Sequence, residues 1–209
     1  MHELTRKLWD RQNQHAGGRK RLFAAMGRAT NATTALYPGS YVDIAASFTF
    51  PSVTYVDSDG RAARFFSDST GVDEIIAEHG PSAQERTWEF IGADYTTDVG
   101  LPDAHFDLLI SLYAGFVAEP CARYLRPRGW LLVNPSHGDA AIAAIDPRYR
   151  LVGILQLRAG AYSVSDRNLD SYLIPKRDVE VTADLIHESG RGVAYTKSPF
   201  AYLFRLVYG

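Results

Sequence analysis

Residues suited to ligand binding follow four short apolar runs, and we call the point where each run gives way to these residues a junction. The first two junctions lie near the beginning of the chain. The run 33–37 ends in Tyr37-Pro38-Gly39-Ser40. A glycine there lets the backbone approach a ligand closely, and the amides that follow can face an anion, although the same residues also form a simple turn. Asp57 ends the run 53–56, about 20 residues later, where an acid can accept both hydroxyls of a ribose. Its alternative role is to cap the next helix, together with Ser58 and Asp59.

Two further junctions carry polar and aromatic side chains in the same arrangement. Asp94 and Tyr95 follow the run 87–91. The carboxylate of Asp94 can reach the amino group of an adenine, and the Tyr95 ring can stack on it. Ser111-Leu112-Tyr113 ends the apolar run 106–112. In an open parallel sheet such strand ends line the ligand cleft, and the alternative is ordinary strand termination.

A polar cluster after residue 133 holds the one candidate general base. The segment 134–139 reads NPSHGD, and His137 has the side chain whose ordinary pKa suits proton transfer near neutral pH. Ser136 and Asp139 have the spacing of a helix capping box, which explains half of the cluster structurally. The remaining histidines show no metal-ligand spacing, and we expect no metal site.

The predicted strands and helices that position these residues alternate along the chain. Period-two and continuous apolar runs predict strands, and the intervening segments predict helices. The expected strands are 33–37, 53–56, 87–91, 106–112, 130–133, 149–157 and 200–207, and the expected helices include 3–14, 43–50, 71–79, 115–125, 138–144 and 178–188. This alternation predicts an α/β fold, a Rossmann-like and mainly parallel seven-stranded sheet with helices on both faces.

Composition and charge bound the remaining possibilities. The 209 residues, 46% of them hydrophobic, suit one domain over 1–209, with an N-terminal helical segment over 1–30 and a less regular insertion over 158–198. Cys121 is the single cysteine, and no signal peptide or membrane-spanning run is present, so we expect a cytoplasmic protein without a membrane partner. Residues 1–30 carry seven Lys/Arg and two acids, which leaves contact with nucleic acid open.

The order of these junctions resembles the class I S-adenosylmethionine-dependent methyltransferases. The similar segments are ALYPGSYVDI, TYVDSD, FIGADY, FDLLISLY and RYLRPRGWLLVN, so the resemblance covers about residues 33–157 and the final strand at 200–207. It implies an antiparallel last strand, S-adenosyl-L-methionine as a small-molecule cofactor, and a substrate-covering role for 158–198. The cofactor-binding residues that it implies are Tyr37, Gly39, Ser40, Asp57, Ser58, Asp94, Tyr95, Ser111 and Leu112.

The loop after the first strand departs from the family pattern. Tyr37 stands where the family has an acid, and Tyr41 and Asp43 stand where it has glycines. Three functions therefore stay open: a methyltransferase of unknown acceptor, a non-catalytic methyltransferase-like binding protein, and a nicotinamide-dependent oxidoreductase. The single glycine disfavours the third, because a pyrophosphate needs closer backbone approach.

Overall fold

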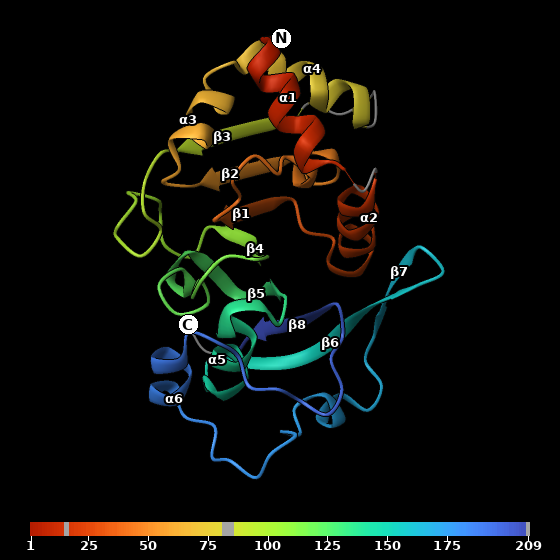
Figure 1. Ribbon diagram of the computed structural model, residues 1–209, viewed down its shortest axis with the longest axis vertical. Coiled ribbons are helices and arrows are strands. Elements are labelled where there is room, and N and C mark those ends of the chain that lie inside the picture. The colour runs from red at the N-terminus through yellow and green to blue at the C-terminus, as the bar shows by residue number, and fades with distance from the viewer. Residues whose placement is uncertain (15–16, 81–85, 208–209) are drawn as a thin grey trace. The chain divides into compact units, whose positions relative to one another are not determined.

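The computed structural model describes residues 1–14, 17–80 and 86–207, and the chain divides into two compact units, Met1–Val99 and Gly100–Gly209 (Figure 1). The elements of the first unit are α1 (Glu3–Gln12), α2 (Gly18–Thr30), β1 (Thr34–Pro38), the 3-10 turn η1 (Ala45–Phe48), β2 (Ser52–Val56), α3 (Gly60–Phe66), α4 (Ser69–His79) and β3 (Thr87–Ile91). We call these units the first unit and the second unit.

The first unit is built on three parallel strands with β2 in the middle. Leu36 of β1 is in register with Thr54 of β2, and Val53 of β2 is in register with Trp88 of β3. α1 packs against α3 and α4, and α2 packs against η1. Aromatic side chains fill the spaces between these elements: the rings of Phe66 and Phe90 stack with centroids 4.4 Å apart. Because parallel strands end at one edge, the turns after β1 and β2 lie close together.

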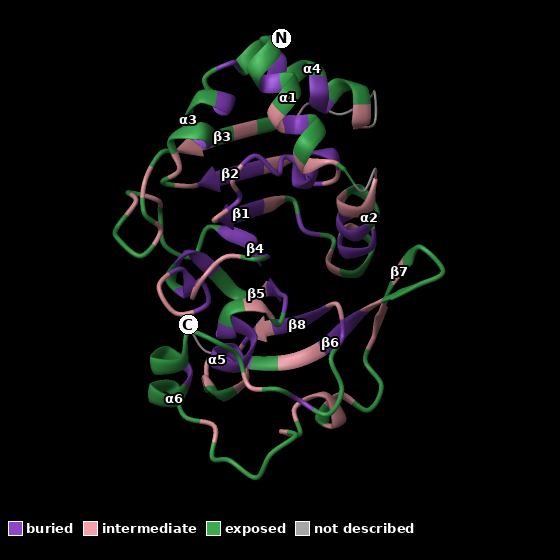
Figure 2. Ribbon diagram, in the orientation of Figure 1, coloured by how far each residue is buried: buried purple, intermediate pink, exposed green. Residues whose placement is uncertain are grey.

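The second unit contains five strands in the order β4-β5-β8-β6-β7. Its elements are β4 (Phe106–Ser111), the 3-10 turn η2 (Ala122–Tyr124), β5 (Leu125–Val133), the 3-10 turn η3 (Ser136–Gly138), α5 (Asp139–Ile145), β6 (Tyr149–Arg158), β7 (Ala161–Ser165), the 3-10 turn η4 (Leu169–Tyr172), α6 (Ala183–Ser189) and β8 (Ala201–Leu206). β4 and β5 are parallel, whereas β8 is antiparallel to both β5 and β6. All six residues of β4 are buried, as expected for a central strand (Figure 2).

The predicted α/β architecture is confirmed, with one strand more than expected. β1 to β5 pair in parallel within their units, and antiparallel pairing is confined to the C-terminal strands. The described part of the chain has eight strands rather than seven, because β7 forms a hairpin with β6 inside the segment 158–198. The turn of this hairpin uses positive φ angles at Ala159 and Gly160, +47° and +76°. β7 is short and has no fully buried residue, so it lacks the apolar run that revealed the other strands.

Two predicted helices were wrong in extent or type. Residues 115–125 hold only η2, and residues 43–50 hold only η1 instead of an α-helix. Pro120 disfavours helical backbone at the residue before it. The Ala118 N–H group donates to the Asp139 side chain and not to a helical carbonyl. The expected turn 126–129 lies within β5 as an irregularity: the pairing passes from Phe106–Leu125 to Leu108–Trp130.

The N-terminal helical segment is present as α1 and α2, and residues 15 and 16 between them lie outside the described residues. His2 N–H and the Thr5 hydroxyl both donate to Asp68 Oδ2, at 2.6 and 2.7 Å, and so join α1 to the start of α4. No helix in the described ranges is both long and apolar enough to cross a bilayer.

Candidate functional site

The turn after β1 was predicted to face a ligand, and two of its residues have positive φ angles. Gly39 has φ = +64° and Tyr41 has φ = +50°, both in the left-handed region. The Gly39 N–H group donates to the Val56 carbonyl at 2.8 Å, which holds the turn beside the end of β2. A glycine adopts positive φ without strain, whereas Tyr41 does so at a cost of about 1 kcal/mol. The conformation at Tyr41 is therefore held by its surroundings.

Asp57 supplies much of that restraint. Its Oδ2 accepts the Tyr41 N–H group at 2.7 Å, and its Oδ1 accepts the Asp59 N–H group at 2.8 Å. The side chain is half-buried at the carboxyl end of β2. The structure thus brings together two positions that the sequence placed at separate junctions, Asp57 and the turn after β1. A carboxylate oxygen can accept two hydrogen bonds, so each Asp57 oxygen keeps a further acceptor position.

Ser40 contributes a buried hydroxyl that the fold does not use. The residue is 2% exposed, and within the described ranges its Oγ has no hydrogen-bond partner. A buried polar group without a partner costs about 1–3 kcal/mol, so such atoms often mark a place where a ligand or water completes the structure. Ser40 was predicted to contact a cofactor, and its orphaned hydroxyl lies in the turn that Asp57 holds.

Tyr37 and Asp43 form a buried polar cluster with Arg19, which we call the Tyr37 cluster. The Tyr37 hydroxyl donates to Asp43 Oδ2 at 3.1 Å, and Arg19 Nε lies 3.0 Å from the same oxygen. Burial raises the pKa of Tyr37 well above its ordinary value, and the charge of Asp43 adds to the effect. Burial also raises the pKa of Asp43, while Arg19 acts in the opposite direction.

The sequence missed the Tyr37 cluster. The structure places the Tyr37 side chain in the core, 1% exposed, against Phe23 and Tyr55, and its contact with a cofactor stays a prediction. The only signal for the cluster was the pair of unusual residues, Tyr37 and Asp43, at positions where the similar family has an acid and a glycine. Nothing in the spacing pointed to Arg19, which belongs to α2.

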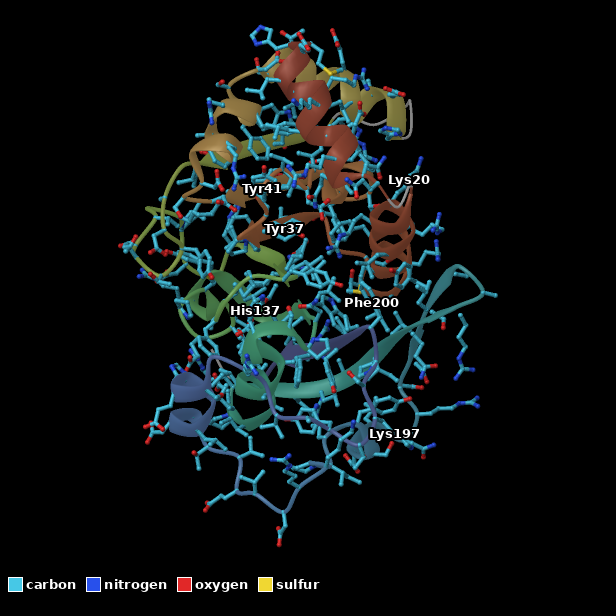
Figure 3. The ribbon with its side chains drawn as sticks, viewed as in Figure 1. Lys20, Tyr37, Tyr41, His137, Lys197 and Phe200 are labelled. Atoms are coloured by element: carbon cyan, nitrogen blue, oxygen red, sulfur yellow. The ribbon has the colours of Figure 1, made fainter. Side chains whose placement is uncertain are left out.

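Tyr41 lies on the outer side of the same turn and lines a small polar pocket. The Arg61 guanidinium carbon lies 5.2 Å from the centre of the Tyr41 ring, and Arg61 also pairs with Asp59 at 2.6 Å. Figure 3 labels both Tyr37 and Tyr41, which come from the two ends of this turn. The pocket encloses about 390 Å³, and its lining residues are Leu8, Arg11, Gln12, Gln14, Tyr41 and Arg61.

The remaining predicted residues of the first unit are exposed or half-buried. Asp94 is exposed, and its Oδ1 accepts both the N–H group and the hydroxyl of Thr96, at 2.9 and 2.8 Å. These hydrogen bonds lower the pKa of Asp94. Ser58 is exposed and Tyr95 is half-buried. The helix cap of α3 is Asp59 alone, whose side chain accepts the Arg61 N–H group at 2.7 Å. Contact of Ser58, Asp94 and Tyr95 with a cofactor stays a prediction.

In the second unit, Ser111 at the end of β4 faces a buried carboxylate. The Ser111 hydroxyl donates to Asp139 Oδ2 at 2.5 Å, and the Ala118 N–H group donates to Asp139 Oδ1 at 3.0 Å. Leu112 is buried, whereas Tyr113 is 55% exposed with φ = +60°. The backbone after β4 is therefore tied to the first residue of α5.

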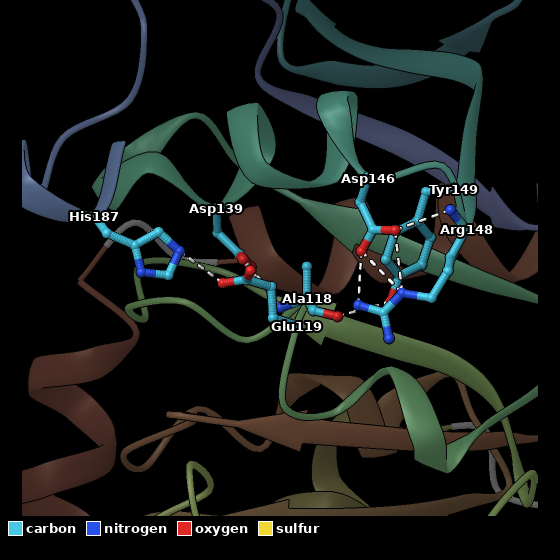
Figure 4. Close-up of polar contacts among 7 residues, drawn as sticks. All are labelled: Ala118, Glu119, Asp139, Asp146, Arg148, Tyr149 and His187. Carbon is cyan, nitrogen blue, oxygen red and sulfur yellow. Dashed lines mark hydrogen bonds and ion pairs between the residues drawn. The ribbon is translucent and has the colours of Figure 1, made fainter. Parts of the chain in front are cut away.

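Asp139 is 1% exposed and is surrounded by neutral hydrogen-bond donors. Burial raises its pKa to about 6, against the lowering effect of its bonds from Ser111 and Ala118. The same region holds Cys121, whose pKa is raised to about 12 by burial and by the charge of Asp139. Figure 4 shows Asp139 beside Ala118, with the Glu119–His187 ion pair nearby.

The predicted capping box after β5 does not form. The Ser136 hydroxyl donates to Asn134 Oδ1 at 2.7 Å, and Asp139 points to Ser111 instead. His137 is exposed with φ = +59°, and in the described part of the chain it takes part in no hydrogen bond or ion pair. Its role as a general base stays a prediction.

Comparisons with known proteins give a likeness of fold alone. No protein-family model matches the sequence, and no curated protein matches it. A structure from Klebsiella pneumoniae, assigned as an O-methyltransferase, aligns with a TM-score of 0.50 at 14% identity, over 78% of this chain and 88% of that chain. The N-methyltransferase NodS from Bradyrhizobium japonicum, in complex with S-adenosyl-L-homocysteine, aligns with a TM-score of 0.49 at 11% identity, over 91% and 86%.

A third structure aligns over a shorter part of the chain. A protein from Methanococcus maripaludis, assigned as an S-adenosyl-L-methionine-dependent methyltransferase, aligns with a TM-score of 0.47 at 14% identity, over 63% of this chain. The chain spans 61% of that protein's length. The Klebsiella match shows a shared α/β Rossmann-like fold, and its low identity assigns no substrate.

Proposed function

We propose that this chain binds S-adenosylmethionine at the turn after β1 and acts as a methyltransferase. The observation that carries the proposal is the position of Asp57: a half-buried carboxylate at the end of β2 that accepts the Tyr41 N–H group at 2.7 Å and keeps unused acceptor positions. In Rossmann-like folds an acid at this strand end binds ribose hydroxyls. The shared fold with an assigned O-methyltransferase supports the choice of cofactor.

The residues of the turn offer hydrogen-bonding groups that suit the ribose hydroxyls of such a ligand. Asp57 offers acceptors for ribose hydroxyls, and the orphaned Ser40 hydroxyl offers a donor and an acceptor that no protein group occupies within the described ranges. Gly39, in the left-handed region, leaves its backbone open to close approach. When bound, S-adenosylmethionine supplies an electrophilic methyl group, and the contribution of these residues is to bind and orient it.

The second candidate is a binding protein that has kept the fold and lost methyl transfer. The Tyr37 cluster favours it, because a tyrosine and a buried carboxylate occupy positions where the similar family has an acid and a glycine. The exposed His137, without a partner in the described part of the chain, leaves the proposed site without an oriented general base. Binding of the cofactor with no transfer to any acceptor would support this candidate.

Isothermal titration of the full chain with S-adenosylmethionine and S-adenosylhomocysteine tests the proposal. We expect both ligands to bind, and native mass spectrometry of the purified protein to detect an adenosine-containing adduct. Asp57→Ala should weaken binding by about a hundredfold, because it removes two charge-assisted hydrogen bonds. Glu78→Ala is the matched control, since the one ion-pair partner of this exposed acid on α4 among the described residues is Arg6, at 3.7 Å.

Two results would end the proposal. Absence of binding at millimolar concentration of either ligand would exclude the cofactor. An Asp57→Ala variant that melts like the Glu78→Ala protein and binds with unchanged affinity would show that Asp57 only holds the turn.

A further inference from the structure

The late segment of the second unit encloses a pocket that the proposed function does not use. Residues 174–176 and 194–196 pair as two antiparallel stretches: Lys176 N–H donates to the Ala194 carbonyl, and Thr196 N–H donates to the Ile174 carbonyl, both at 2.8 Å. α6 forms the opposite wall. The pocket has a volume of about 430 Å³, within the range typical of small-molecule sites. It is formed by elements of the second unit alone.

Close packing fixes the wall that α6 provides. Ile186 is 1% exposed, and a Cβ atom added at Gly138 would lie 2.8 Å from its Cγ2. Gly192 is also tightly packed, since its added Cβ would lie 3.3 Å from Gly138 Cα. His187 stacks on Phe116 with ring centroids 4.6 Å apart, and it also pairs with Glu119 at 2.9 Å. These contacts hold α6 against the body of the second unit, so the pocket is formed before any ligand arrives.

The lining of the pocket separates apolar from cationic groups and contains no acid. Leu185 and Val179 are 39% and 40% exposed, unusually high for large apolar side chains, and Ile186 lies beneath them. The cations of the lining are Lys176, Arg177 and Arg191. All three are exposed, and none has an ion-pair partner among the residues that the structure describes.

The acids of the same segment lie outside the lining. They are Asp178, Glu180, Asp184 and Glu188, all exposed. The segment as a whole is therefore not basic, and the positive charge is concentrated at the pocket. An apolar hollow with unpaired cations at its edge is complementary to a molecule with an apolar body and an anionic head.

We infer that this pocket binds a single amphipathic anion, a molecule with a carboxylate or similar head group and an aliphatic or aromatic body. Leu185, Ile186 and Val179 contact the apolar body, and Arg177, Arg191 and Lys176 bind the head group. The inference does not rest on the proposed function, because it involves no cofactor and no residue of the first unit.

Isothermal titration with decanoate below its micelle concentration tests the inference on the full chain without cofactor. We expect one molecule to bind per chain, and decanol and decyltrimethylammonium to bind at least about tenfold more weakly, because the head group loses its charge or reverses it. Leu185→Asp should abolish binding, and the double variant Arg177→Gln/Arg191→Gln should weaken it by about tenfold.

Matched controls distinguish the pocket from general surface effects. Leu157→Asp changes an apolar residue of β6 that is 49% exposed, and Arg150→Gln changes an exposed arginine of the same strand; neither lines the pocket. Both controls should bind decanoate as the unmodified protein does. All five substituted side chains are exposed, and circular dichroism melting verifies that each variant is folded.

Three results would overturn the inference. They are absence of decanoate binding at millimolar concentration, equal affinity for decanoate and decyltrimethylammonium, and unchanged affinity in the folded Leu185→Asp variant. If the first result came with binding to anionic phospholipid vesicles, the site would recognise a membrane surface. Loss of cofactor binding in the separate Asp57 experiment has no bearing on any of these results.

Discussion

Each unit has a buried carboxylate in the segment that follows a strand, Asp43 after β1 and Asp139 after β5, and these two carboxylates are compensated differently. Asp43 in the first unit and Asp139 in the second are each 1% exposed. Asp43 has a cation, Arg19 at 3.0 Å, and a tyrosine hydroxyl as partners. Asp139 has neutral partners, the Ser111 hydroxyl and the Ala118 N–H group. Burial raises the pKa of both groups, but among the residues that the structure describes only Asp43 has a countercharge to oppose it.

The difference shows what each carboxylate does for its unit. Arg19 favours the ionised form of Asp43 against the effect of burial, and this ion pair joins α2 to the turn after β1. Asp139 accepts hydrogen bonds from the Ser111 hydroxyl and the Ala118 N–H group, and so joins the loop after β4 to α5. Its carboxylate charge is uncompensated above a pH of about 6. The compensation of the Asp43 charge comes from a partner side chain, whereas the charge of Asp139 is removed only by protonation.

The largest effect is expected from removal of the countercharge. Arg19→Leu should lower the free energy of unfolding by about 3 kcal/mol at pH 7.5, because it leaves Asp43 buried and unpaired. The loss should become smaller as the pH is lowered, since burial raises the pKa of Asp43 and so favours uptake of a proton by its carboxyl group. Lys20→Leu on the same helix is the control, because Lys20 is exposed (Figure 3). Urea unfolding of both variants measures the difference, and equal losses would refute the pairing.

A smaller, pH-dependent effect is expected at Asp139. Its folded pKa of about 6 exceeds the ordinary value of 3.8, so the folded state binds the proton more tightly. The stabilising contribution is complete below pH 3.8 and is lost as the pH rises through 6, by about 2–3 kcal/mol. The free energy of unfolding of Asp139→Asn, relative to the unmodified protein, should therefore rise between pH 4 and pH 8. A difference that is constant over this range would show that Asp139 does not titrate in that window.

The smallest effects are expected from two buried serines, of which Ser111 has a hydrogen-bond partner for its hydroxyl and Ser40 has none in the described ranges. Ser111→Ala removes a donor to Asp139 and should cost about 1–2 kcal/mol at pH 7. Ser40→Ala removes a hydroxyl without a partner in the described ranges and should change the free energy of unfolding by less than about 0.5 kcal/mol. Thermal melting of both variants compares them directly. A Ser40→Ala loss as large as that of Ser111→Ala would mean that the Ser40 hydroxyl is satisfied.

The sequence predicted the frame of the molecule because its strands are apolar runs bounded by turn residues. The run 87–91 became β3 with the same bounds, and the adjacency of Asp57 and the turn after β1 follows from parallel pairing. What it could not predict depends on tertiary packing. The partnership of Arg19 with Asp43 requires the position of α2. Ser136 and Asp139 have the spacing of a capping box, and the same aspartate is recruited by Ser111, a residue 28 positions earlier.

The single cysteine gives the second unit a built-in reporter. Cys121 is buried, and its raised pKa keeps it as a thiol at neutral pH, so alkylating reagents cannot attack it in the closed structure. The segment 1–99 contains no cysteine. The rate of alkylation therefore measures how often the second unit opens, independently of any opening of the first, and a ligand of the late pocket would slow this reaction without any label being introduced.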